Sequence, residues 1–113
     1  MILADTTIVQ PDLVVLTPDR ERFITERAIE GPPALVVEIV SPSSARQDRL
    51  TKAALYARFG IPHYWVLDPV ERTFELYELR GDVHGLVATY READRVRPAL
   101  FPGLEIDLAA VWA

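Results

Sequence analysis

The chain has 113 residues, of which half are hydrophobic, 12 are basic and 17 are acidic, so its formal net charge is −5. This length fits one domain, residues 1–113, and the hydrophobic content excludes an intrinsically disordered chain. The absence of cysteine excludes a disulfide framework, a thiolate zinc site and a cysteine nucleophile. Apolar runs are too short to span a membrane, and residues 1–10 lack the pattern of a secretory signal, so we expect a cytoplasmic protein.

Two strands separated by a polar segment are expected in the first part of the chain. Residues 12–17 are rich in Val and Leu and predict the first strand, whereas residues 18–31 are polar and predict a loop with one turn of helix. Residues 34–40 are almost continuously apolar, which is typical of a central strand covered on both faces. Glu38 is the one charged residue in that run.

A long helix is expected next. Ser44 and Gln47 have the spacing of a capping box, which predicts the start of a helix. The helical pattern continues to Phe59, where Gly60 supplies a left-handed position after the last turn and Pro62 prevents continuation.

The remaining segments predict further strands. Residues 63–67 are aromatic and apolar, and a turn at Asp68 joins them to a strand at 73–79 as a hairpin. Residues 87–90 and 105–108 are further short strand candidates. This order predicts an α+β domain in which one long helix packs on a mixed sheet.

Glu38 and Asp12 are acidic residues in or beside predicted strands, where a role in packing alone would favour other residue types. A carboxylate in an apolar strand needs a partner, which is either a salt bridge or hydrogen bond from a neighbouring loop, or a metal ion. Asp12 is either an ordinary residue at the start of a strand or the second ligand of the same ion, if the two strands are neighbours. Carboxylate oxygens, with the backbone carbonyl of Ile39 as a third donor, suit Mg²⁺ or Mn²⁺.

Lys52 is the only lysine in the chain, because the other basic residues are all arginine. A helical wheel places Asp48, Lys52 and Tyr56 in one stripe, with Leu55 and Phe59 beside it and Ala54 and Ala57 on the opposite side. This stripe has two interpretations. Asp48 and Lys52 form a surface ion pair, with the lysine stem lying over apolar surface. Alternatively, Lys52 has a chemical role that requires a compact positive charge.

Four segments of the sequence, read together, resemble the Uma2 family of the PD-(D/E)XK nuclease superfamily. They are QPDLVV at 10–15, LVVEIVSPSS at 35–44, the stripe of Asp48, Lys52 and Tyr56, and FGIPHYWVLDP at 59–69. The resemblance extends from residue 9 to about residue 108, and it is most specific between residues 36 and 69.

The resemblance implies a restriction endonuclease-like core and an endonuclease that hydrolyses phosphodiester bonds, in DNA, with Mg²⁺ or Mn²⁺. Asp12 and Glu38 match the acidic positions of the superfamily and would hold the ion together with the carbonyl of Ile39. The superfamily usually has a lysine two residues after the glutamate, where this chain has Val40. The resemblance implies that Lys52 on the helix takes over the catalytic role of that lysine.

Four more residues have supporting roles in this interpretation. Asp48 would position Lys52 or act as an outer acid, and Tyr56 would hydrogen-bond a carboxylate that binds the ion. Arg46 and Arg49, on the first turns of the helix, are either phosphate contacts or solvated surface residues.

Two alternatives to an active nuclease remain at this point. Members of the family usually have several dozen more residues before the segment that matches Gln10, which favours a non-catalytic domain that pairs through a sheet edge with another subunit as a homodimer. The second alternative is an unrelated small α/β protein in which Glu38 is simply salt-bridged.

Overall fold

The computed structural model describes the backbone of residues 1–4, 7–8, 11–25, 28–40 and 45–113, and the side chains of residues 1–2, 11–25, 28–40 and 51–113. Its main feature is a five-stranded mixed sheet in the order β3-β4-β5-β6-β7. These strands are β3 (Leu13–Val15), β4 (Leu35–Ile39), β5 (His63–Asp68), β6 (Thr73–Arg80) and β7 (Val83–Arg91). The pairs β3–β4, β5–β6 and β6–β7 are antiparallel, and β4 and β5 run parallel.

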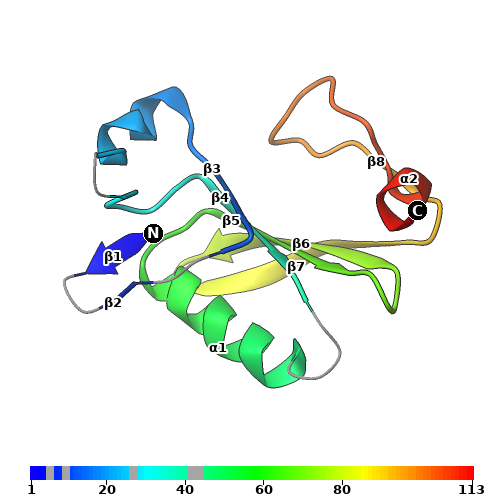
Figure 1. Ribbon diagram of the computed structural model, residues 1–113, viewed down its shortest axis with the longest axis horizontal. Helices are drawn as coiled ribbons and strands as arrows, with labels where there is room; N and C mark the ends of the chain where they lie inside the picture. The colour runs from blue at the N-terminus through cyan, green and yellow to red at the C-terminus, as the bar shows by residue number, and fades with distance from the viewer. Residues whose placement is uncertain (5–6, 9–10, 26–27, 41–44) are drawn as a thin grey trace.

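Helix α1 (Ala45–Arg58) connects the parallel strands β4 and β5 and covers one face of the sheet (Figure 1). Two neighbouring strands that run parallel require such a crossover, because a tight turn reverses the chain direction and can join only antiparallel strands. Gly60 follows the helix with φ +75°, which is the left-handed conformation predicted for it. The buried cluster on this face consists of Val36, Val40, Tyr56, Ile61, Tyr64 and Val66.

The other face of the sheet is covered by the C-terminal segment, which contains β8 (Arg95–Val96), β9 (Ile106–Asp107) and α2 (Leu108–Trp112) (Figure 1). The buried cluster on this side consists of Leu35, Val37, Trp65, Phe74, Val96 and Leu108. Strand β4 therefore contributes to both clusters, which confirms that its continuous apolar run belongs to a strand covered on both faces.

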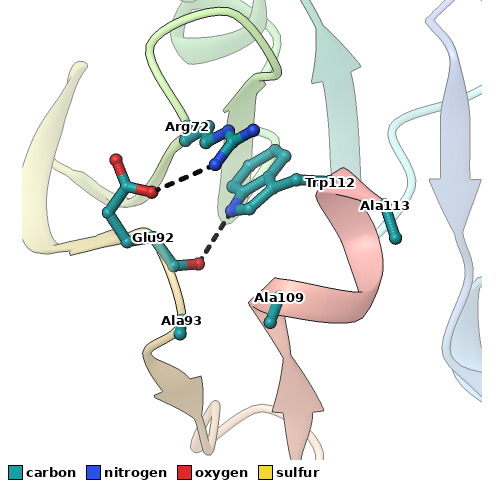
Figure 2. A pocket seen from close by; sticks show the side chains of 6 residues that line it. All are labelled: Arg72, Glu92, Ala93, Ala109, Trp112 and Ala113. Carbon is teal, nitrogen blue, oxygen red and sulfur yellow. Dashed lines mark hydrogen bonds and ion pairs between the residues drawn. The ribbon is translucent and has the colours of Figure 1, made fainter.

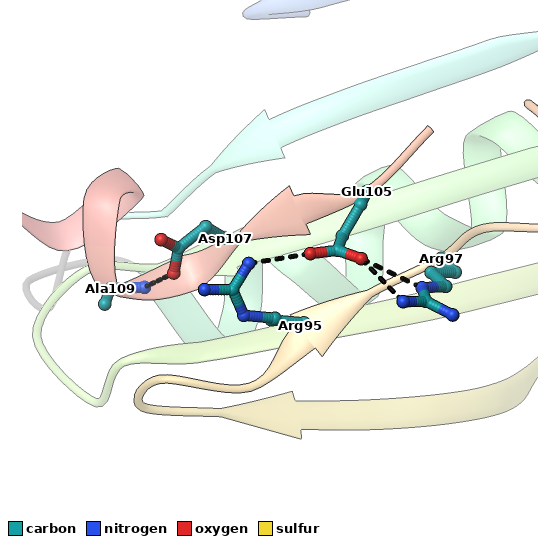
Figure 3. Close-up of polar contacts among 5 residues, drawn as sticks. All are labelled: Arg95, Arg97, Glu105, Asp107 and Ala109. Carbon is teal, nitrogen blue, oxygen red and sulfur yellow. Dashed lines mark hydrogen bonds and ion pairs between the residues drawn. The ribbon is translucent and has the colours of Figure 1, made fainter. Parts of the chain in front are cut away.

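Polar contacts hold the C-terminal segment together. Glu105 accepts hydrogen bonds from Arg95, at 2.7 Å, and from the Nε and a terminal nitrogen of Arg97, at 3.0 and 2.8 Å (Figure 3). The Trp112 indole N–H donates to the carbonyl of Glu92 at 2.8 Å, beside the Arg72–Glu92 ion pair (Figure 2). Helix α2 is thereby tied to the turn after β7.

The N-terminal part adds a small hairpin of β1 (Ile2–Ala4) and β2 (Thr7–Ile8) and the 3₁₀ helix η1 (Pro18–Phe23). The single helical turn predicted within 18–31 is thus η1. Gly31 is buried against the ring of Phe23, and a Cβ at residue 31 would overlap that ring.

Most predicted elements are present, with boundaries that differ by a few residues. Strand β7 is longer than the predicted 87–90, and the segment predicted as a strand at 105–108 contains β9 followed by the start of α2. The expected helix cap at Ser44 lies outside the described residues. In the part of the chain that the structure describes, no helix is long and apolar enough to cross a membrane.

Candidate active site

Glu38 lies near the end of β4 on the sheet face that α1 covers. Its neighbours Val36 and Val40, which share this face, belong to the buried cluster under the helix. Only 4% of Glu38 is exposed, and it is the one charged residue among the buried residues of the described chain. Its carboxylate therefore depends on partners within the protein.

Two side chains of α1 supply those partners. The Tyr56 hydroxyl donates a hydrogen bond to Oε1 of Glu38 at 2.5 Å, and the Lys52 ammonium lies 3.4 Å from Oε2. Tyr56 is fully buried, whereas 31% of the Lys52 side chain is exposed. The carboxylate is thus held from one side by a buried hydroxyl and from the other by an ammonium that reaches solvent.

The pKa of Glu38 is raised above its ordinary value of 4.5, mainly because burial disfavours the charged carboxylate. The Tyr56 hydrogen bond and the positive charge of Lys52 oppose this rise, and the negative charge of Asp12 adds to it. Two neighbouring negative groups, one of them poorly solvated, form a site at which an added cation is electrostatically favoured.

Asp12 is placed beside Glu38 by the pairing of the first two strands of the sheet. The register pairs Leu13 with Val37, so the residue before β3 lies opposite Glu38. The Asp12 carboxylate accepts a hydrogen bond from the backbone N–H of Ile39 at 2.6 Å. The expectation that Asp12 and Glu38 project from neighbouring strands to one corner of the sheet agrees with this geometry.

The rotation of α1 brings Lys52 to the edge of its buried face. The helix turns Tyr56, Ala53 and Ala57 toward the sheet, and Ala57 is only 5% exposed. Ala57, which the wheel places on the side opposite Lys52, is therefore turned toward the sheet, and Leu55, which it places beside the stripe, is only half-buried. Lys52 lies at the margin of this buried face of the helix. Its aliphatic stem crosses the margin, and its ammonium reaches Glu38.

The other predicted site residues are described only in part. Val40, at the position where a lysine was missing from the expected motif, is 8% exposed and packs in the cluster under α1. A lysine there would be buried, whereas Lys52 reaches the same carboxylate from the helix. The side chains of Arg46, Asp48 and Arg49 lie outside the described residues, so their roles stay predictions.

His84 is a contributor to the site that the sequence analysis missed. It lies on β7, and its ring nitrogens are 2.7 Å from the carbonyl oxygen of Ile61 and 3.4 Å from that of Ala53. Its ring also contacts Tyr64, which in turn contacts Tyr56. His84 thus helps to hold α1 against the sheet, but an isolated histidine in an edge strand has no sequence pattern that would indicate this.

The carboxylates present fit a hard divalent cation. Each carboxylate oxygen has two acceptor positions, so Asp12 and Glu38 keep acceptor capacity beyond the three contacts described above. No group of three or more acidic, histidine or cysteine side chains is found among the described residues. A cation at this corner would therefore need, besides Asp12 and Glu38, ligands from the backbone or from water.

The fold matches that of a solved nuclease-like protein. The structure described as "a putative nuclease belonging to DUF820", from Anabaena variabilis ATCC 29413, superposes with a TM-score of 0.70 at 19% sequence identity. The match covers 92% of this chain and 59% of that one. The predicted fold class, an α+β domain with one long helix packed on a mixed sheet, is confirmed.

The chain belongs to the Uma2 family, whose model, described as "putative restriction endonuclease", matches residues 1–109. An uncharacterized protein of Synechocystis sp. is 32% identical over 87 residues, which is 76% of this chain and 45% of the relative. The chain thus spans about half the length of this relative and about three fifths of the structural neighbour.

Proposed function

We propose that this chain is a Mg²⁺- or Mn²⁺-dependent endonuclease that hydrolyses phosphodiester bonds in DNA and acts as a homodimer. The observation that carries the proposal is the meeting of three groups at one corner of the sheet: the buried Glu38 carboxylate, Asp12 on the neighbouring strand and the Lys52 ammonium from the helix. Family membership and the nuclease-like fold support it.

Each side chain has a defined task in the proposed reaction. Asp12, Glu38 and the Ile39 carbonyl would hold the ion, which when bound polarises the scissile phosphate and lowers the pKa of a water ligand. Lys52 orients the attacking water and stabilises negative charge that develops on the phosphate oxygens. Tyr56 fixes the orientation of the Glu38 carboxylate through its hydrogen bond.

Two further roles rest on sequence position alone. Asp48 lies one helical turn before Lys52 and would orient its ammonium. Arg46 and Arg49 lie at the start of α1, from which they would contact the phosphate backbone of the substrate. The acidic net charge of the chain makes such local cations necessary for binding a polyanion.

A non-catalytic domain is the second candidate, and one observation favours it. Both oxygens of Glu38 already have partners in Tyr56 and Lys52, as they would in a structural ion pair. The other alternative, an unrelated small α/β protein in which Glu38 is simply salt-bridged far from Asp12, does not agree with the geometry, because the charge of Asp12 acts on Glu38.

The test measures cleavage of supercoiled DNA and of a single-stranded RNA with Mg²⁺, with Mn²⁺ and with chelator. We expect metal-dependent cutting of DNA by the wild type and a loss of at least about a hundredfold in Glu38→Gln and in Asp12→Asn. The matched control is Glu75→Gln, because Glu75 also accepts a hydrogen bond from a tyrosine, Tyr77, at 3.0 Å.

A second measurement follows metal binding without catalysis. Mn²⁺ should raise the melting temperature of the wild type and of Glu75→Gln, and this rise should disappear in Asp12→Asn. Equal residual cutting by the wild type and Glu38→Gln would identify a contaminating nuclease. A dimer that neither cuts DNA nor gains stability from Mn²⁺ would favour the non-catalytic candidate.

A further inference from the structure

Strand β7 is the longest strand of the described chain, and it lies at the edge of the main sheet. Its one sheet neighbour among the described strands is β6. Nine residues of extended chain span about 30 Å, and Figure 1 shows β6 and β7 as the longest hairpin of the fold. A free edge of this length is a template for pairing with another chain.

The composition of β7 lacks the features that normally prevent such pairing. Residues 83–90 contain no acidic residue, lysine, arginine or proline, the residues with which natural proteins protect edge strands. Three apolar side chains are exposed along it: Val83 at 59%, Leu86 at 52% and Val87 at 46%. The opposite edge, β3, has three residues and offers a much shorter template.

Charge indicates which partner suits this edge. The whole chain has a net charge of −5, so two copies repel each other over most of their surface at low ionic strength. An uncharged eight-residue stretch is a place where two copies can approach without placing like charges opposite each other. A second copy also presents an identical row of backbone donors and acceptors, so the contact is self-complementary.

The register of the hairpin places one residue at the centre of this contact. The pairing shifts between Leu76 and Tyr77 and passes over Val87, which is the middle residue of β7. This bulge bends the strand at its midpoint and separates two extended stretches, residues 83–86 and 88–91.

We propose that the outer edge of β7 is the homodimer interface, with two copies of β7 antiparallel about a two-fold axis near Val87. The two main sheets then form one continuous sheet. Glu38 lies on β4, which two strands separate from β7 in the sheet order, so the pairing leaves the candidate active site accessible. The inference specifies the surface of the homodimer proposed above, and it does not depend on catalysis.

The absence of cysteine permits a direct test by cross-linking. In Val87→Cys the two thiols would meet across the axis, within the separation that a disulfide requires, and mild oxidation should give a covalent dimer. The matched control is Val70→Cys, because Val70 is 63% exposed but lies in the turn between β5 and β6. We expect this control to stay monomeric on denaturing gels.

Sedimentation equilibrium gives an independent measurement on untagged protein. Wild type and Val70→Glu should dimerise with similar affinity, whereas Val87→Glu should weaken dimerisation by at least about tenfold, because like charges then face each other. Mixing Val87→Glu with Val87→Lys should restore the dimer. Circular dichroism verifies that each variant is folded.

Two outcomes would overturn the interface: a monomeric wild type, or a dimer whose affinity does not change in Val87→Glu and that Val87→Cys does not cross-link. Nuclease assays on the same preparations separate this inference from the proposed function. A β7-dependent dimer without activity refutes the catalytic proposal alone. Metal-dependent cutting by a monomer refutes the interface and the homodimer, but not the catalytic proposal.

Discussion

Replacing Lys52 by methionine removes the positive partner of a buried carboxylate while keeping most of the apolar stem. Loss of one partner of a fully buried ion pair costs about 3–5 kcal/mol, and an exposed pair is worth about 0–1 kcal/mol. This pair lies between the two limits, because the side-chain exposure is 31% for Lys52 and 5% for Glu38. We therefore expect Lys52→Met to lower the free energy of unfolding by about 2 kcal/mol near neutral pH.

The size of this effect should depend on pH, with a sign that follows from the pKa of Glu38. Burial raises that pKa above 4.5 in the folded chain, so the stability linked to this carboxyl is fully present below pH 4.5 and is lost as the pH rises through the folded pKa. Lys52 opposes the raised pKa. Replacing Lys52 should therefore lower the free energy of unfolding only slightly in acid, where Glu38 is protonated. The loss should be largest above the pKa that Glu38 has in the variant.

Urea denaturation of four proteins measures the effect: wild type, Lys52→Met, Glu38→Gln and the double variant. A loss of about 2 kcal/mol lowers the melting temperature of a domain of this size by about 8 °C. In the Glu38→Gln background the same lysine replacement should cost less than about 1 kcal/mol, because no buried charge then needs a partner. An equal cost in both backgrounds, or a cost that does not change with pH, would refute the electrostatic account of the pair.

Three further substitutions test contacts around the two cores by urea denaturation. Tyr56→Phe removes a hydrogen bond to a buried carboxylate and should cost about 2 kcal/mol, and no loss would show that the bond is not formed. Trp112→Phe removes the bond to the Glu92 carbonyl and should cost about 1 kcal/mol and expose α2 to early proteolysis. Gly31→Ala should cost about 1–3 kcal/mol, because the new methyl meets the ring of Phe23, and an unchanged stability would contradict that packing.

Local patterns determined much of this fold from the sequence. The apolar run of β4, the helix between residues 44 and 59, Gly60 after it and the hairpin at Asp68 all follow from periods and turn residues that act within a few positions of one another. The single glutamate in that run and the single lysine on the helix indicated Glu38 and Lys52, because a charge in an apolar setting requires a partner. Asp12 was indicated by its position at the start of the first predicted strand, and the resemblance of the surrounding segments supported it.

Local sequence patterns could not predict the features that depend on contacts between distant segments of the chain. The cover on the second face of the sheet comes from residues 95–112, whose short elements carry almost no periodic signal. The role of His84 became visible only when β7 was placed beside α1. Both depend on which segments meet after the chain has folded.

The rotation of α1 shows most clearly what the tertiary structure alone decided. The wheel placed Lys52 and Tyr56 on one side of the helix, but it does not fix which direction along that side faces the sheet. Packing against the whole sheet turned Ala53 and Ala57 inward and left Lys52 at the margin, 3.4 Å from Glu38. A helix settles at the angle that buries the most apolar surface without voids, and that sum over many distant neighbours is not contained in the helix's own sequence.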